Sequence, residues 1–203
     1  MNDEPIYLDH NATTPILPEV VDAMLPYLRE HFGNPSSSHA YGRRAREAVE
    51  RARREVAALL GCDDDEIVFT SGGTEANNLA IRGAAETLGA PGHLVTTAVE
   101  HPATAGPCAF LEAHGWRVTR LGVDAQCRVR AAEIASALAG EVALVSVMHS
   151  QNETGVLQPI AAIASAARAR GALVHTDAAQ SIGKVPVDVR ALDVDLLSVA
   201  GHK

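Results

Sequence analysis

The chain ends in Gly201-His202-Lys203, and the lysine is the residue with the clearest chemical potential. It follows an apolar run, Asp195–Val199, that is typical of a buried strand. A lysine just past such a strand lies where open α/β sheets bind their ligands. An amine partly removed from water can keep its lone pair free, which a Schiff-base lysine requires. The alternative is a lysine on a solvated loop, since most lysines are surface charges.

A second candidate is the segment Ser71-Gly72-Gly73-Thr74, which precedes a predicted helix. Glycines let the backbone approach a ligand, and a helix start offers free N–H groups that favour an anion. The hydroxyl of Thr74 adds a further donor. These features predict a phosphate site, but an ordinary helix start with a hydroxyl cap explains them equally well.

Asp177 follows another apolar run, Ala172–Thr176. A carboxylate beside a buried strand needs a cation or several donors to offset its desolvation. A protonated pyridine nitrogen would supply that cation, and protonation makes the ring a better electron sink. The alternative is structural, because Asp177 and Gln180 have the spacing of a capping box.

Two further polar residues follow predicted strands. His101 could stack on a flat cofactor and move protons near neutral pH, or it could be a partly buried histidine bonded to backbone. Asn152 could hold a phenolic oxygen or a carboxylate, or it could form a turn with Gly155. Taken together, an amine, a phosphate site, an acid, a ring-stacking group and a polar clamp are the parts of a pyridoxal 5′-phosphate (PLP) site.

A strand–helix alternation must position these residues. Strands are predicted at 66–70, 93–97, 116–121, 142–148, 172–176 and 195–199, and helices at 18–32, 40–60, 74–88, 103–114, 131–138 and 160–170. The alternation predicts an α/β fold, with a mostly parallel sheet and helices on both faces. The candidate groups then lie at the carboxyl ends of five strands of one sheet.

The composition suits a globular domain and argues against other classes of protein. A net charge of −8 and an aromatic content of 3% argue against a nucleic-acid-binding surface. Three cysteines without regular spacing predict neither a zinc site nor disulfides, so a reducing, cytoplasmic location is expected. The N-terminus has no signal-peptide core, and no apolar run is long enough to cross a membrane.

Seven strings resemble, in order and spacing, the cysteine desulfurases of the iron–sulfur-cluster-assembly and nitrogen-fixation branch. They are Tyr-Leu-Asp-His-Asn-Ala-Thr-Thr-Pro (7–15), Gly-Asn-Pro-Ser-Ser (33–37), Thr-Ser-Gly-Gly-Thr-Glu-Ala-Asn-Asn (70–78), Glu-His-Pro-Ala (100–103), Asn-Glu-Thr-Gly (152–155), His-Thr-Asp-Ala-Ala-Gln (175–180) and Gly-His-Lys (201–203). The resemblance covers nearly the whole chain. It implies a class V aminotransferase of fold type I, with residues 16–203 as the PLP-binding large domain and residues 1–15 as an entry segment on the side of a small domain.

The resemblance also implies a role for each candidate residue. Lys203 would form the Schiff base with PLP and move the proton on the substrate Cα, and His101 would stack on the pyridine ring and assist this transfer. Asp177 would pair with the ring nitrogen. Gln180 would hold the phenolic oxygen, and Asn152 would lie beside cofactor and substrate. The phosphate would be bound by Gly73, Thr74 and His202.

The implied activity removes sulfur from L-cysteine, giving L-alanine and an enzyme persulfide that is passed to an acceptor or scaffold protein. The resemblance further implies a homodimer. In the family the sulfur-accepting cysteine lies in the C-terminal half, on a mobile loop, and none of Cys62, Cys108 and Cys127 falls at that position. For Cys62 and Cys108 we expect structural burial instead. The 203-residue chain alone is therefore expected not to turn over cysteine.

The chain departs from the family pattern at Ala200, where a serine usually helps to bind the phosphate. One hydrogen bond would be absent, and a bond of this kind is worth about 1.5–3 kcal/mol. Selenocysteine lyases can also lack that serine, so selenocysteine remains an alternative substrate. A further alternative is a non-catalytic scaffold or split-protein partner that keeps the fold for dimerisation or carrier binding.

Overall fold

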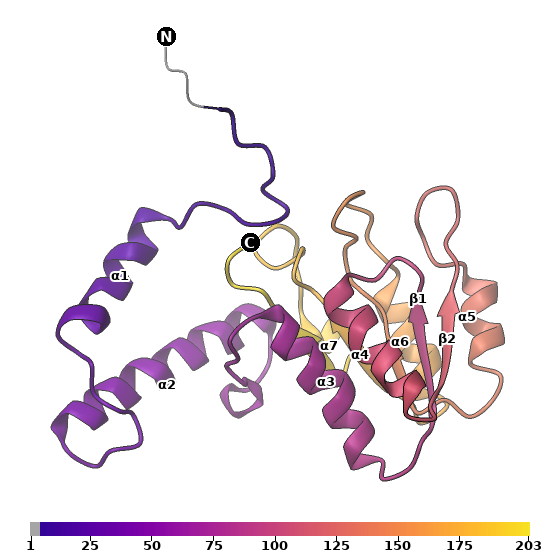
Figure 1. Cartoon of the computed structure of the whole chain (residues 1–203), viewed down its shortest axis with the longest axis horizontal. Helices are drawn as coiled ribbons and strands as arrows, with labels where there is room; N and C mark the ends of the chain where they lie inside the picture. Colours follow the sequence, from indigo (N-terminus) through magenta and orange to yellow (C-terminus); the bar gives the residue numbers. More distant parts are fainter. Residues whose placement is uncertain (1–4) are drawn as a thin grey trace. The chain divides into compact units, whose positions relative to one another are not determined.

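The computed structural model describes residues 5–203, which divide into two compact units (Figure 1). The first unit runs to Phe69 and includes His202. The second comprises Thr70–Gly201 together with Lys203. Most of the candidate site residues belong to the second unit. The predicted division of the chain at residue 15 stays a prediction.

The second unit is built on five parallel strands in the order β2-β1-β3-β4-β5. Strand β1 has β2 on one side and β3 on the other, so the sheet grows in opposite directions from β1. In open α/β sheets such a switch point forms a crevice at the carboxyl ends of the strands. The predicted parallel sheet is confirmed. Its strands are β1 (His93–Thr97), β2 (Arg117–Leu121), β3 (Leu144–Ser146), β4 (Leu173–Asp177) and β5 (Leu196–Ser198).

Helices cover both faces of this sheet, as the sequence predicts. On one face, Ile81 and Leu111 from two helices pack with Leu94 of β1 and Leu144 of β3. The helices of the second unit are α3 (Gly73–Thr87), α4 (Pro102–Ala113), α5 (Ala131–Ala137), α6 (Ile160–Arg168) and the short α7 (Val189–Leu192), which the sequence did not predict. Helices α3 and α4 form this first layer.

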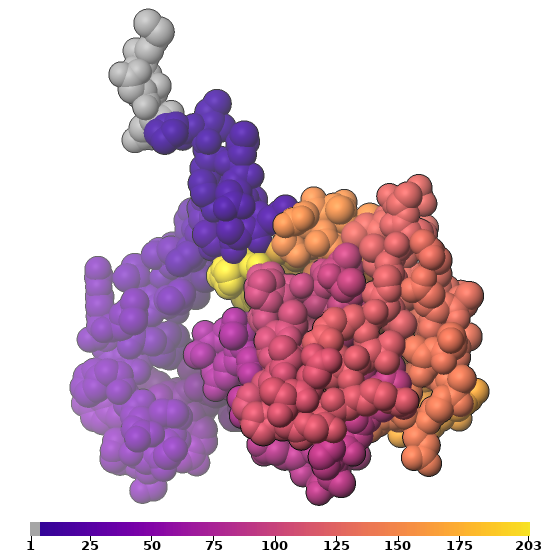
Figure 2. Space-filling model, turned by 45° about the vertical axis from the view of Figure 1, so that its right-hand side comes forward, coloured from indigo at the N-terminus to yellow at the C-terminus, as the bar shows by residue number. Residues whose placement is uncertain are grey.

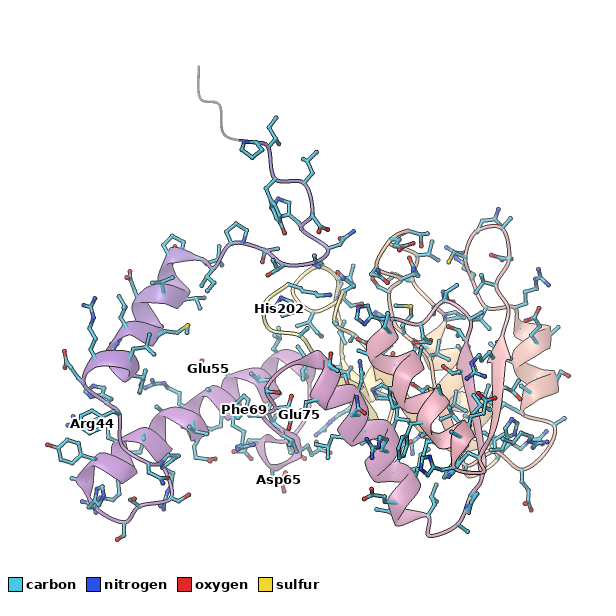
Figure 3. The ribbon with its side chains drawn as sticks, viewed as in Figure 1. Arg44, Glu55, Asp65, Phe69, Glu75 and His202 are labelled. Carbon is cyan, nitrogen blue, oxygen red and sulfur yellow. The ribbon has the colours of Figure 1, made fainter. Side chains whose placement is uncertain are left out.

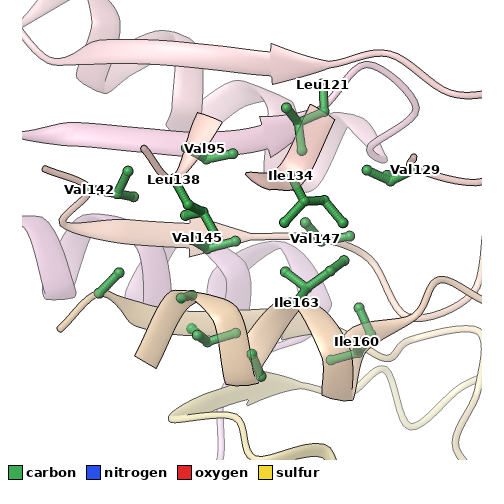
Figure 4. Close-up of a cluster of buried hydrophobic side chains, with 14 residues drawn as sticks. Val95, Leu121, Val129, Ile134, Leu138, Val142, Val145, Val147, Ile160 and Ile163 are labelled. Carbon is green, nitrogen blue, oxygen red and sulfur yellow. The ribbon is translucent and has the colours of Figure 1, made fainter. Parts of the chain in front are cut away.

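The opposite face carries the larger hydrophobic core (Figure 4). Ile134 of α5 and Ile163 of α6 pack there against Val95, Val145 and Val174 of the three central strands. These valines are register partners of one another across β1, β3 and β4, so they form one row under the two helices. The strands are therefore buried on both faces, which explains their nearly continuous apolar sequences.

The first unit contains α1 (Pro18–Arg29), α2 (Ala40–Leu60) and the 3₁₀ helix η1 (Asp64–Glu66). Helix α2 has the bounds predicted from its periodicity. Its start is capped by the side chain of His39, and its end is capped by Gly61 at φ 72°, where glycine is favoured. Its charged face is exposed, and Figure 3 labels two of these side chains, Arg44 and Glu55.

Helix α1 begins where predicted but ends at Arg29, short of the predicted residue 32, and none of its residues is buried. Helical spacing places Val20, Met24 and Leu28 on one apolar stripe, and all three are exposed. The helix belongs to the indigo segment of Figure 2. Periodicity therefore predicted the element correctly, while the burial that normally accompanies such a stripe is not seen here.

The strand predicted at 66–70 is wrong. Residues 64–66 form η1, and the residues that follow pair with no strand in the described part of the chain. Val68 and Phe69 are exposed, and the Arg53 guanidinium lies over the Phe69 ring and donates to the carbonyl of Ile67. A β-branched and aromatic sequence thus forms no strand here, because propensity for strands depends on tertiary context.

Within residues 5–203, no helix is both long and apolar enough to cross a membrane.

Candidate active site

The sheet face beneath α3 and α4 changes from apolar to polar along the strands. Near the amino ends, Leu94, Leu144 and Leu173 are register partners across β1, β3 and β4. Two residues further on, Ser146 pairs with His175. Alternate residues of a strand share a face, so this polar row lies on the same side as the leucines and closer to the carboxyl ends.

His175 is the centre of the polar row and is fully buried. Its Nδ1 lies 2.9 Å from the Ser146 hydroxyl and its Nε2 lies 3.0 Å from the Ser198 hydroxyl. Burial lowers the pKa of His175 to about 4, against the opposing effect of the Asp177 charge. The ring is therefore neutral near pH 7, with one nitrogen donating and the other accepting.

Asp177 ends β4 on the same face, and it is buried. Its Oδ2 accepts from the Asn77 amide at 2.8 Å and from the Thr104 hydroxyl at 3.4 Å, while its Oδ1 accepts from the Ala179 N–H at 2.9 Å. Among the described residues, no lysine, arginine or histidine forms an ion pair with this carboxylate. Donors thus surround Asp177, but within residues 5–203 its charge has no side-chain counterion.

The predicted capping box at Asp177 is not formed in full. Asp177 does accept from the backbone of Ala179, but residues 179–184 form turns rather than a helix. Gln180 accepts from the ammonium group of Lys184 at 3.1 Å and is half-buried. One oxygen of Asp177 therefore accepts from the backbone N–H of Ala179, and the other accepts from side chains of α3 and α4. A purely local role does not account for this carboxylate.

The Gly-Gly-Thr segment forms the start of α3, with Gly72 as its N-cap and Gly73 and Thr74 as its first residues. Gly72 has φ 158°, and a Cβ placed there would meet no atom within 4 Å. A Cβ on Gly73 would lie 3.5 Å from the Ala200 methyl group, just past β5. Glu75, labelled in Figure 3, accepts from the Ser71 N–H at 2.5 Å. The first turn of α3 is thus adjacent to the end of β5.

Asn77 connects the two predicted ends of the cofactor site. It lies three residues after Thr74, close to one turn along α3, and its amide reaches Asp177. The acid and the Gly-Gly-Thr helix start therefore lie in one region, separated by about a helical turn. This arrangement is what one ring with a phosphate group on its far side requires.

His101 is the N-cap of α4, and its Nδ1 accepts from the Ala103 N–H at 3.1 Å. In the neutral ring this bond assigns the proton to Nε2. The backbone bond expected for a structural histidine is therefore present, and it leaves the Nε2–H for another partner. The half-buried ring belongs to the loop between β1 and α4, at the carboxyl end of the sheet.

Asn152 lies in the turn that follows β3 and is half-buried. The turn is organised by Gln151, whose side-chain oxygen accepts from the N–H groups of Glu153 and Thr154, each at 2.7 Å. The Asn152 side chain accepts a longer bond, 3.4 Å, from Gln151. Gln151 therefore builds the turn, and the structural role suggested for Asn152 is carried mainly by its neighbour.

The two terminal candidates differ in their surroundings. His202 belongs to the first unit, where its Nδ1 lies 3.2 Å from the Thr13 hydroxyl and its carbonyl accepts from the Thr14 N–H. Lys203 is assigned to the second unit and is half-buried. The roles inferred for both residues by resemblance stay predictions.

Of the two cysteines expected to be buried, Cys108 is buried and Cys62 is only half-buried. Cys108 of α4 is fully buried, as expected, and burial raises the pKa of its thiol to about 11. Cys62 and Cys127 are half-buried and free of disulfides. Cys108 packs in the hydrophobic core on the inner side of α4, and a thiol with a raised pKa is a poor nucleophile, so its role is structural.

Sequence reasoning missed three polar residues that organise this region, namely Asn77, Thr104 and Glu100. Asn77 and Thr104 each lie three residues after a predicted site residue on the same helix, and that helical spacing could have identified both. Glu100 precedes His101, and its carboxyl group accepts from the Thr97 hydroxyl at 2.7 Å and the Met148 N–H at 3.0 Å. No pattern in the sequence pointed to Glu100.

The sequence is similar to those of several curated proteins named cysteine desulfurases. Cysteine desulfurase from Trichormus azollae is 47% identical over 198 residues, and cysteine desulfurase IscS from Anaeromyxobacter sp. (strain K) is 51% identical over 201 residues. Each alignment covers 98% of this chain and 50% of the relative. The chain thus spans about half the length of the curated relatives it matches.

Solved structures are similar over the same part of the chain. A structure titled "SspA in complex with cysteine" superposes with a TM-score of 0.92 at 39% identity, covering 97% of this chain and 57% of that one. The apo structure of cysteine desulfurase from Thermococcus onnurineus NA1 gives a TM-score of 0.91 at 30% identity, covering 98% of this chain and 50% of that one. Both agree with the predicted fold of type I PLP enzymes.

A family model adds the last comparison. The model described as aminotransferase class-V matches residues 6–203, which is nearly all of the sequence. The resemblance inferred from the seven strings is therefore confirmed. The chain belongs to the class V aminotransferase family, whose members depend on PLP, and the relatives it matches are cysteine desulfurases.

Proposed function

We propose that this chain binds PLP and forms the cofactor-binding part of a cysteine desulfurase. The observation that carries the proposal is the 2.8 Å hydrogen bond from Asn77 of α3 to the buried Asp177 at the end of β4. It brings the acid and the Gly-Gly-Thr helix start into one region. An arrangement in which these two features diverged would have excluded a single cofactor.

The acid end of the site fits a pyridine ring. Asp177 is buried among neutral donors and has no cationic partner among the described side chains. A protonated ring nitrogen would neutralise this carboxylate, and the carboxylate would keep that nitrogen protonated. The neutral His175 nearby adds no competing charge.

The other end fits a phosphate group. The first turn of α3 presents backbone N–H groups, and the hydroxyl of exposed Thr74 is available beside them. Gly72 and Gly73 leave space that side chains would fill. The methyl group of Ala200 borders this space, where a hydroxyl would have added one further donor.

The bound cofactor would supply the chemistry by withdrawing electrons from the bonds at the substrate Cα. Lys203 would hold PLP covalently and then carry the Cα proton. His101, with its proton on Nε2, would lie against the ring and assist that transfer. Asn152 would orient cofactor and substrate, and Gln180 would hold the phenolic oxygen. His202 would join Gly73 and Thr74 in holding the phosphate.

The proposed substrate is L-cysteine. Its C–S bond would break as an enzyme thiolate forms a new S–S bond to the departing sulfur, and the remaining carbon would take a proton to give L-alanine. The resulting persulfide would be delivered to an acceptor protein. A cytoplasmic homodimer remains the expected form, although one relative, from Drosophila melanogaster, is named mitochondrial.

The two lysines of the chain, Lys184 and Lys203, offer a sharp test. After incubation with PLP and reduction with borohydride, peptide mapping should find the cofactor on Lys203. Lys203→Ala should abolish the visible absorbance of bound PLP. The matched control, Lys184→Ala, removes an exposed lysine that bonds Gln180 and should keep the absorbance. Equal labelling of both lysines would contradict the proposal.

Activity should be measured on the polypeptide at its full natural length, by release of alanine from cysteine. The environment of Ala200 keeps selenocysteine lyase as a second candidate, since the Gly73 cradle lacks the usual hydroxyl. Competition between cysteine and selenocysteine separates the two activities. Absence of any bound-PLP absorbance after reconstitution would instead favour a non-catalytic scaffold.

A further inference from the structure

Glu100 occupies the switch point of the sheet, in the loop between β1 and α4. Within the described part of the chain, one of its carboxyl oxygens accepts hydrogen bonds and the other does not. Oε1 accepts from the Thr97 hydroxyl at the end of β1 and from the Met148 N–H just past β3. Oε2 is buried and has no hydrogen-bond partner among the described residues.

The bond to Met148 fills a gap in the sheet. Beyond the strand ends, the backbone continues to connect neighbours: the Ala98 N–H donates to Leu121, the His149 N–H donates to Asp177, and Ala178 donates to Ser198. Between the ends of β1 and β3 the acceptor is a side chain instead of a backbone carbonyl, because the Met148 N–H donates to the Glu100 carboxyl group. Glu100 therefore connects the loop of His101 to the strand that leads into the Asn152 turn.

The charge of this carboxyl group matters because a second carboxyl is close. Burial raises the pKa of Glu100 to about 7; the bonds from Thr97 and Met148 lower it, and the charge of Asp177 raises it. Cys108 of α4 is another titratable group nearby, and its raised pKa keeps it neutral. Two neighbouring buried carboxyls do not readily ionise together, and Asp177 has the larger set of donors.

We propose that Glu100 is a positioning residue that acts in its protonated, uncharged form, holding the His101 loop and the β3 end together while leaving Asp177 as the single anion of the site. An ionised Glu100 would place a carboxylate oxygen without any donor in a buried position, which costs far more than an unpaired hydroxyl. The protonation state of Glu100 does not depend on the proposed function. Only its expected effect, a site with a single carboxylate for one cationic ring nitrogen, rests on that function.

The protonation state can be measured without PLP. Difference infrared spectroscopy of the cofactor-free protein between pH 6 and pH 9 should show loss of one protonated carboxyl band in the wild type. Glu100→Gln should remove this band. Glu112→Gln, the same change at an exposed carboxyl of α4 that pairs with Arg120, should keep it. An identical spectrum for wild type and Glu100→Gln would overturn the proposal.

The consequence can be measured on the PLP-bound protein. At pH 6, Glu100→Gln should bind PLP within about threefold of the wild type, since the amide oxygen keeps both acceptor bonds. Between pH 6 and pH 9 the PLP affinity of the wild type should fall relative to that of the variant, because only in the wild type does a second carboxylate form near Asp177 and repel the anionic cofactor. A variant that loses PLP at pH 6 would show that the negative charge is needed, against the proposal.

The two arms separate this inference from the proposed function. If the wild type binds no PLP, the proposed function fails, while the infrared band still decides the state of Glu100. If Glu100→Gln does not fold, the wild-type titration between pH 6 and pH 9 still shows whether a buried carboxyl loses its proton there. A wild-type protein with no such band would refute the inference.

Discussion

The two ends of the sheet both hold buried polar side chains, but they balance charge in different ways. At the carboxyl end, Asp177 is buried among donors with no cationic partner in the described chain. At the amino end, His93 is buried and bonds the exposed Arg117 at 2.8 Å. Burial and the Arg117 charge both lower the pKa of His93. A hollow of about 520 Å³ lies at this end, lined also by Glu141 and Arg170.

The difference shows which polar cluster requires a ligand. The arginines at the amino end are exposed, so water stabilises their charge, and neutral His93 needs no counterion. Asp177 is buried and forms no ion pair with a cationic side chain among residues 5–203, and a buried carboxylate is costly unless something else neutralises it. The size of the hollow is therefore a weaker indication of function than an uncompensated buried charge.

The largest expected effect concerns the histidine at the carboxyl end. The pKa of His175 falls from 6.5 to about 4 on folding, so between these values the unfolded state binds more protons. Stability should then decrease by about 3 kcal/mol as the pH falls from 6.5 to 4. The contribution of Glu100 to stability has the opposite pH dependence, because its pKa is raised and its contribution is lost as the pH rises from 4.5 to 7. The effect of His175 on unfolding free energy should therefore be measured in the Glu100→Gln variant.

The control for this prediction is the same variant with His175→Asn added. His93 and His149, whose pKa values burial also lowers, contribute in the same direction and remain in both proteins. Urea unfolding at several pH values gives the difference. If the single and double variants lose stability equally on acidification, His175 is not the buried neutral group described here.

Removal of the acid should have the next largest effect. Asp177→Ala deletes the partner of the proposed ring nitrogen, and charged hydrogen bonds of this type are worth about 1.5–3 kcal/mol. PLP affinity should fall roughly 10- to 100-fold, as followed by absorbance titration. Asp65→Ala, at an exposed position of η1, serves as the matched control. Unchanged affinity in Asp177→Ala would remove the basis of the comparison between the two ends.

A smaller effect is expected at the helix start. Gly72 has φ 158°, so Gly72→Ala should destabilise the protein by about 1 kcal/mol or more and weaken PLP binding. Gly83 lies inside the same helix with room for a methyl group, and Gly83→Ala should stabilise by roughly 0.5–1 kcal/mol. Thermal unfolding of both variants should therefore give shifts of opposite sign; equal shifts would argue against a glycine requirement at Gly72.

The smallest effect is expected at the amino end. Arg117→Ala removes an exposed cation, so unfolding free energy should change by less than about 1 kcal/mol and PLP affinity should not change. The pKa of His93 should rise toward its ordinary value, because Arg117 lowers it. Histidine titration by NMR tests this directly. A loss of PLP binding in Arg117→Ala would mean that the two ends are coupled.

Much of this architecture could be predicted from local sequence. The alternation of apolar strands and amphipathic helices predicted the parallel sheet with two helical layers, and α2 has its predicted bounds. The pattern at 66–70 misled because Val68 and Phe69 have strand-forming side chains without a neighbouring strand. Local propensity describes a segment, whereas pairing depends on where its neighbours lie.

The site was predictable in its parts but not in its connections. Residue types at predicted strand ends indicated Asp177 and Thr74, yet the bond that unites their regions comes from Asn77, 100 residues from Asp177 along the chain. Glu100 and Met148 are 48 residues apart, and their contact depends on the strand order at the switch point. Such contacts are set by topology, which a single sequence does not specify.

The buried thiol of Cys108 gives the molecule an internal reporter of opening. Because the group is sealed under α4 and its proton is tightly held, an alkylating reagent should modify Cys62 and Cys127 long before it reaches Cys108. Labelling at that single position would therefore follow separation of α4 from the sheet. The labelling rate, measured with and without PLP, would show how much the bound cofactor stabilises the packing of α4, which carries Thr104 and is preceded by His101, against the sheet.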